Sequence, residues 1–179
     1  MGIKDNQRIN INDIMESKKT GEKLVFMSVP DYTSARWAEM GGIDVAVVGD
    51  SLAVVAHGYP NTIPATMDMM TMHALAVRKG APNTFVLGCM PYQTYNTPDR
   101  ALINASRLMQ EAGCDAVKPQ GGKTQAHILK TLVDSKKVDL ERDDEILNNL
   151  GSRISQNEQR LAEDNQLIDN LRDIPFSRN

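Results

Sequence analysis

The sequence has few aromatic residues, no excess of basic charge and no long apolar run. Phe, Trp and Tyr make up 4% of the 179 residues, so aliphatic side chains and the ten methionines must fill most of the core. The net charge is −3 at pH 7. Because no basic cluster stands out, this balance argues against a nucleic-acid or anionic-membrane partner. No apolar run reaches the roughly 20 residues that a membrane-spanning helix needs.

Cysteine is also scarce, and the two present do not form a CxxC pair. Cys89 and Cys114 are 25 positions apart in the sequence, so we expect two free thiols rather than a zinc or redox motif. The first ten residues are polar and lack the apolar segment of a signal peptide. We therefore expect a cytoplasmic protein.

Charge and helix-breaking residues divide the chain near Ser135. Residues 136–179 hold seven basic and ten acidic residues and carry the whole net charge, whereas residues 1–135 are neutral overall. In residues 1–135, short apolar runs alternate with amphipathic stretches and Gly or Pro. We therefore expect a folded α/β domain over 1–135 and a charged helical extension over 136–179.

The front part repeats a strand-then-helix pattern. Continuous apolar runs, typical of parallel strands buried on both faces, lie at 24–27, 45–48, 84–87 and 115–117. The predicted helices between them have clear ends. Thr97-Pro98-Asp99 supplies a cap, a first-turn proline and an acid near the positive end of the helix dipole, and Gly113 ends that helix. Further helices are expected from Asn12 to Gly21, over 34–40, from Thr66 to Gly80 and from Thr124.

Four such units indicate a parallel sheet, either half of a (β/α)₈ barrel or a small doubly wound sheet. The residue pattern alone leaves both open. Polar residues follow the predicted strands at their carboxyl ends, where both architectures place their chemistry. These residues are Asp50, Ser51, Cys89, Lys118 and Gln120.

Each of these residues has a structural alternative. Asp50 could be a metal ligand or base, or only cap the Gly-Asp-Ser turn. Ser51 could bind a substrate carboxylate or be a turn residue. Lys118 could bind an anion at the strand ends or extend into solvent. His57 and His73 have no partner at metal-binding spacing, so we interpret His73 as a core or surface residue.

The tail has a seven-residue apolar repeat typical of an imperfect coiled coil, interrupted at Gly151. Its alternatives are a solvated helical extension or a helix packed on the front domain. The repeat consists of Leu140, Leu147, Ile154, Leu161 and Ile168.

Several motifs in register resemble the ketopantoate hydroxymethyltransferase family from about Lys18 to Ser135. They are Val-Val-Gly-Asp-Ser-Leu at 47–52, the segments 58–66, 76–83 and 90–92, and Val-Lys-Pro-Gln-Gly-Gly at 117–122. The resemblance implies a (β/α)₈ barrel of the phosphoenolpyruvate/pyruvate type, of which four βα units are present here. It also implies transfer of a hydroxymethyl group from 5,10-methylenetetrahydrofolate to 3-methyl-2-oxobutanoate, in pantothenate biosynthesis.

By the same resemblance, Asp50 matches a Mg²⁺ ligand, Ser51 a contact to the keto acid's carboxylate, and Lys118 the substrate-binding lysine of the catalytic centre. Three features depart from the family. Cys89 stands where the family has a second metal-binding aspartate, and Gln120 where it has a glutamate that supports the metal. The family's general-base glutamate lies beyond Ser135, where nothing matches. Mg²⁺ prefers anionic oxygen ligands, so we expect its binding to be weakened or lost.

Three functions therefore remain open at this stage. The chain could be an active hydroxymethyltransferase, a catalytically inactive relative that binds a small α-keto acid or oligomerises, or a related carbon–carbon lyase or mutase acting on oxo-acids. Four βα units would leave two open sheet edges, so we expect a homo-oligomer.

Overall fold

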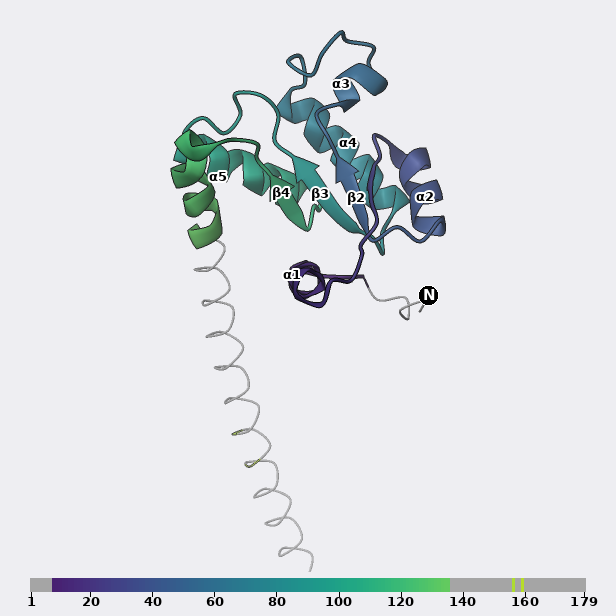
Figure 1. Ribbon diagram of the computed structural model, residues 1–179. Helices are drawn as coiled ribbons and strands as arrows, with labels where there is room; N and C mark the ends of the chain where they lie inside the picture. Colours follow the sequence, from purple (N-terminus) through teal and green to yellow (C-terminus); the bar gives the residue numbers. More distant parts are fainter. Residues whose placement is uncertain (1–7, 136–155, 157–158, 160–179) are drawn as a thin grey trace, which may run out of the picture. The chain divides into compact units, whose positions relative to one another are not determined.

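The computed structural model describes residues 8–135, 156 and 159 (Figure 1). Its strands are β1 (Phe26–Ser28), β2 (Val45–Val48), β3 (Phe85–Cys89) and β4 (Ala116–Lys118). Its α-helices are α1 (Ile11–Thr20), α2 (Tyr32–Met40), α3 (Leu52–Val55), α4 (Met67–Gly80) and α5 (Pro98–Ser106). A π-helical turn, η1 (Arg107–Glu111), and a 3₁₀ turn, η2 (Lys123–Gln125), complete this set. Residues 126–135 are also helical.

The four strands lie side by side in chain order, β1-β2-β3-β4, and every neighbouring pair is parallel. A doubly wound sheet would instead reverse its strand order at a switch point. Because right-handed connections place all intervening helices on one face of a sheet with consecutive strands, this order is that of half a (β/α)₈ barrel. The barrel-type α/β fold predicted from the sequence is confirmed, and the doubly wound alternative is excluded.

The helices and the sheet form two layers. Figure 1 shows α2, α4 and α5 along the same face of the sheet, and α1 near the amino-terminal ends of the strands. The main core lies between these layers and is almost entirely aliphatic, as the scarcity of aromatic residues predicts. Its fully buried members include Ala46, Val48, Leu52, Met70, Ala74, Val77, Val86, Ala101 and Leu108.

The contact between α2 and α4 depends on a glycine. A Cβ atom placed on Gly80 would lie 2.4 Å from the backbone oxygen of Tyr32 and 3.1 Å from the Cβ of Ala35. Backbone cannot move aside as a flexible side chain can, so only glycine permits this approach. The last turn of α4 is therefore held directly against the first turn of α2.

Arg78 joins the amino-terminal ends of two strands to α4. Its Nε donates to the carbonyl oxygen of Gly113 at 2.9 Å, and its Nη1 donates to that of Thr84 at 2.9 Å. Its Nη2 forms an ion pair with Asp115, and both side chains are about 15% exposed. Asp115 also pairs with Arg8 at 2.7 Å. This hub fixes the starts of β3 and β4, and with them the strand register.

Several predicted element ends are wrong by one to three residues. The leading helix begins at Ile11 rather than Asn12, because the side chain of Asn10 forms the capping box. The first strand lies at 26–28 rather than 24–27, and the third reaches Cys89. The short helix α3 and the π-helical turn were not predicted. The caps at Thr66 and Thr97 and the left-handed Gly113, with φ of 70°, agree with the sequence prediction.

The chain divides into two compact units, Met1–Leu132 and Val133–Asn179, whereas the sequence placed the division at Ser135. The predicted heptad repeat of the tail lies outside the described residues. Within the described part of the chain, no helix is both long and apolar enough to cross a membrane.

The hub predicts unequal effects of two arginine substitutions. Arg78→Met leaves the carboxylate of Asp115 largely buried without its closest cation, and we expect a loss of about 3 kcal/mol in unfolding free energy. The control, Arg107→Met, removes exposed ion pairs to Asp68 and Glu111, and we expect a loss below about 1 kcal/mol. Urea unfolding measures both, and equal losses would contradict the structural role given to Arg78.

Candidate functional site

The register of the sheet decides which side chains share the inner face at the carboxyl ends of the strands. Cys89 is the register partner of Lys118, and Val48 is that of Gly88. A Cβ atom on Gly88 would lie 2.9 Å from the Sγ of Cys114 and 3.3 Å from Leu108, so position 88 faces the helices. Because side chains alternate along a strand, Cys89 points to the other face, which becomes the interior of a barrel.

Asp50, Cys89 and Lys118 form a cluster at this end of the sheet. The Cys89 thiol lies near the Lys118 side chain and the backbone N–H of Asp50, and the charges of both residues act on it. Cys89 is 1% exposed, whereas Lys118 is exposed and Asp50 is half-buried. The sequence predicted these three side chains at the carboxyl ends of three separate strands, and the fold brings them together.

Burial dominates the chemistry of Cys89. Loss of solvation raises the pKa of its thiol above the ordinary value, and the neighbouring Lys118 ammonium lowers that pKa by a smaller amount. The Asp50 carboxylate raises it further. The thiol therefore carries its proton at neutral pH, and the cluster contains a neutral sulfur beside one cation and one anion.

Ser51 lies beside the cluster and begins α3. It is a turn residue at the N-cap position but makes no side-chain capping bond, so its hydroxyl is not used to cap α3. Its Oγ lies 3.0 Å from the position of a Cβ on Gly49, and the Oγ of Ser28 lies 3.8 Å from the same point. Two hydroxyl groups therefore converge near Gly49, and a Cβ atom there would displace the Ser51 hydroxyl slightly.

Ser28 was missed in the sequence analysis. It ends β1 and is in register with Val47 of β2, so it lies on the same face of the sheet. The available signal was a polar residue directly after an apolar run, the same signal that identified the other strand ends. Gln120, in contrast, is exposed two residues beyond β4, farther along the chain than the cluster residues.

This donor set does not fit Mg²⁺. Within the described residues no three His, Cys, Asp or Glu side chains converge on one point. The position between Asp50 and Lys118 is taken by a buried, protonated thiol, and Mg²⁺ binds oxygen ligands in a nearly octahedral arrangement. The Lys118 ammonium near the thiol would further repel a divalent cation. The weakened Mg²⁺ binding expected from the sequence stays a prediction.

The two histidines form a pair, although they do not have metal-binding spacing in the sequence. The Nε2 atoms of His57 and His73 lie 2.9 Å apart. The Nδ1 of His73 also bonds the backbone oxygen of Pro30, directly after β1. Sixteen residues separate the two histidines, a spacing that no standard helical motif produces, so only the fold reveals the pair.

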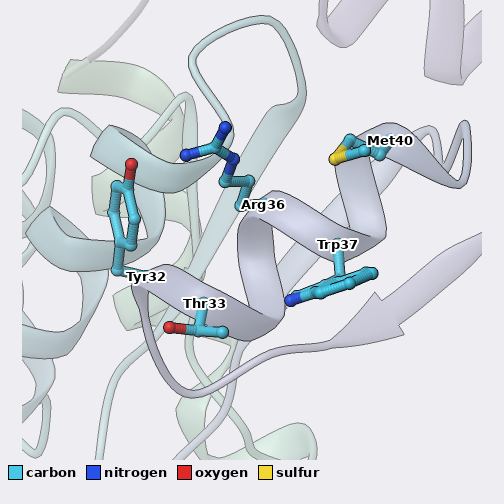
Figure 2. A pocket seen from close by; sticks show the side chains of 5 residues that line it. All are labelled: Tyr32, Thr33, Arg36, Trp37 and Met40. Carbon is cyan, nitrogen blue, oxygen red and sulfur yellow. The ribbon is translucent and has the colours of Figure 1, made fainter.

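A groove of about 410 Å³ lies on the surface of α2, away from the cluster (Figure 2). It is lined by Tyr32, Thr33, Arg36, Trp37 and Met40. None of these residues belongs to the strand-end cluster. The groove is open and all its lining comes from a single helix, so the small strand-end cluster is the better candidate for chemistry.

The fold and the cluster define a class: an α/β protein built as half a (β/α)₈ barrel, with polar groups gathered at the carboxyl ends of its strands. Residues 8–137 match the family model of ketopantoate hydroxymethyltransferase. The chain belongs to this family.

Individual relatives agree with the family match. A 3-methyl-2-oxobutanoate hydroxymethyltransferase of Methylibium petroleiphilum is 71% identical over 131 residues, which is 73% of this chain and 45% of the relative. One of Thermus thermophilus is 46% identical over 126 residues, 70% of this chain and 48% of the relative. The chain thus spans less than half the length of these relatives. A crystal structure of 2,3-dimethylmalate lyase superposes with a TM-score of 0.48 at 19% identity, covering 59% of this chain and 36% of that one.

We expect the buried Cys114 thiol to make the protein less stable at alkaline pH. Burial raises the pKa of the Cys114 thiol from 9.0 to about 12. Above pH 9 the unfolded chain loses this proton while the folded chain keeps it, so the contribution to stability falls between pH 9 and about 12. We expect Cys114→Ala to show a shallower decline of unfolding free energy over this range, measured by urea unfolding at successive pH values. Parallel declines in the two proteins would refute this role of the Cys114 thiol.

Proposed function

We propose that this chain binds a small α-keto acid at the carboxyl ends of β2 to β4 and does not by itself transfer a hydroxymethyl group to it. Family membership supports the ligand class, because the names of the relatives refer to 3-methyl-2-oxobutanoate. The cluster supports the mode of binding. Lys118 offers an exposed ammonium, and Ser51 offers a hydroxyl that is not used for capping.

The ligand's two ends require different partners. A carboxylate gains most from charge-assisted hydrogen bonds, which Lys118 and the hydroxyl of Ser51 can donate. The small aliphatic end requires apolar surface, and Val47 and Leu87, which precede the cluster on the same face, are only half-buried. These features match a short, branched keto acid.

The observation that carries the proposal is the buried Cys89 thiol between Asp50 and Lys118. Removing a proton next to a ketone builds negative charge on the carbonyl oxygen, which a metal ion or preorganised donors must stabilise. The residues present do not fit Mg²⁺, so we assign no reaction step to that ion. Lys118 can still donate to the carbonyl oxygen or the carboxylate, which binds the keto acid without activating it.

A second candidate is an active hydroxymethyltransferase that uses 5,10-methylenetetrahydrofolate, or a related lyase or mutase acting on oxo-acids. Asp50, Ser51 and Lys118, which match the family motif, favour it. We consider it second because enolate formation also needs a general base, and the family's glutamate has no counterpart in residues 136–179.

For both candidate functions, we propose that the chain acts in the cytoplasm.

We also propose that the chain forms homo-oligomers. β1 is an edge strand, and Val25, Phe26 and Met27 are each 45–55% exposed. Unpaired edge strands with apolar side chains favour association with another sheet. A two-fold axis along the barrel axis would place β1 of each copy against β4 of the other and close eight strands. Sedimentation velocity should show a dimer or larger species, and a monomer at all accessible concentrations would contradict this.

Ligand binding can be tested on the purified chain by calorimetry with 3-methyl-2-oxobutanoate. We expect Lys118→Met to weaken binding by about tenfold or more, because a hydrogen bond to a charged group contributes about 1.5–3 kcal/mol. The control is Lys79→Met, in which the exposed lysine lies at the end of α4 opposite the cluster. Absence of binding by the unaltered chain, or equal losses in both variants, would sink the proposal.

The missing activity can be tested separately. With Mg²⁺ and 5,10-methylenetetrahydrofolate present, we expect no ketopantoate from the unaltered chain. The double variant Cys89→Asp, Gln120→Glu should bind Mg²⁺ detectably in calorimetry, because it restores carboxylate oxygen at both positions. Turnover by the unaltered chain would establish the second candidate function.

A further inference from the structure

We propose that His57 and His73 form a binding site for a divalent transition-metal ion of the Ni²⁺, Cu²⁺ or Zn²⁺ type. This site shares no residue with the strand-end cluster and does not depend on the function proposed above. His57 lies in the loop after α3, and His73 lies on α4. The fold brings the Nε2 atoms of the two rings to 2.9 Å from each other.

This separation suits two ligands of one ion. For metal–nitrogen bonds of about 2.0–2.1 Å, two neighbouring nitrogens lie about 2.8–3.0 Å apart at a right angle and about 3.3–3.4 Å apart in a tetrahedron. The observed distance corresponds to the right-angled, tetragonal arrangement that Cu²⁺ and Ni²⁺ favour. The rings are nearly perpendicular, at 78°, so their edges meet without stacking.

His73 is already in the tautomer that a metal ion requires. The oxygen of Pro30 can only accept a hydrogen bond, so the Nδ1 of His73 must carry the proton and donate it. The Nε2 of His73 then has a lone pair, and the Nε2–H of His57 donates a hydrogen bond to it. Histidine ligands of metal ions commonly hold their second nitrogen against a backbone carbonyl in this way.

The backbone that carries His57 is also held firmly. The N–H groups of His57, Gly58 and Tyr59 donate to the carbonyl oxygens of Leu52, Val54 and Ala53 in α3, at 3.2, 3.1 and 2.9 Å. The His57 side chain is exposed, and that of His73 is half-buried. The pair can therefore be reached from solvent. For both lone pairs to converge, the His57 ring must turn and its proton must move from Nε2 to Nδ1.

The ligand set determines the class of ion. Imidazole nitrogen suits Ni²⁺, Cu²⁺ and Zn²⁺, whereas Mg²⁺ and Ca²⁺ prefer oxygen. No third His, Cys, Asp or Glu of the described residues joins the pair, so water completes the coordination. Such a site is open and exchangeable. A bound ion would clamp α4 to the loop after α3, and through Pro30 to the loop after β1.

The test is calorimetric titration of the full chain with NiCl₂ at pH 7.5. We expect one ion per chain, with binding weakened by about tenfold or more in His57→Gln. The matched control is His127→Gln, which removes the third and last histidine of the sequence and should leave binding unchanged. MgCl₂ should give no heat that depends on His57. Binding of Ni²⁺ should also weaken at pH 5.5, where protons compete for the imidazoles.

A second readout is the melting temperature, which Ni²⁺ should raise in the unaltered chain and in His127→Gln but not in His57→Gln. His57 is exposed, so its substitution should not unfold the protein, and circular dichroism of the metal-free variant checks this. Binding that survives in His57→Gln, or that His127→Gln weakens equally, would overturn the proposal.

Discussion

The parallel register of β2, β3 and β4 is the constraint on which the rest of the structure depends. It places Cys89 opposite Lys118, one residue past the pair formed by Val48 and Gly88, and so brings Asp50 to the same point. A shift of one residue would turn Cys89 toward the helices and Gly88 toward the interior. The Arg78 hub fixes this register from the amino-terminal ends, about one strand length away, where it bonds backbone and side-chain atoms at the starts of β3 and β4.

The register assembles a cluster of one cation, one anion and a buried thiol. A buried thiol holds its proton beside a lysine and an aspartate, so one acid and one base balance each other across a neutral sulfur. Such a cluster is suited to receive the carboxylate of a small ligand at Lys118 and poorly suited to concentrate positive charge. Family membership and catalytic competence are separate questions, because activity depends on the side chains at the site and not on the fold alone.

Much of this could be predicted from the sequence, since the signals are local. Thr66 and Thr97 cap helices, Gly113 ends one, and polar residues follow apolar runs at strand ends, all within a few positions of each other. What could not be predicted depends on contacts between distant residues. The His57–His73 pair spans a loop and a helix, and Ser28 converges with Ser51 across two strands. The helix α3 is only four residues long, too short for any periodic pattern.

The central claim, that the register makes Lys118 and Asp50 the charged neighbours of Cys89, is tested most directly by NMR titration of the ¹³Cβ of Cys89. Lys118→Met should raise the pKa of this thiol further, because the nearby positive charge is lost. Asp50→Asn should lower it, because a negative charge is lost. If neither substitution moves the titration of Cys89, the three side chains do not share one site.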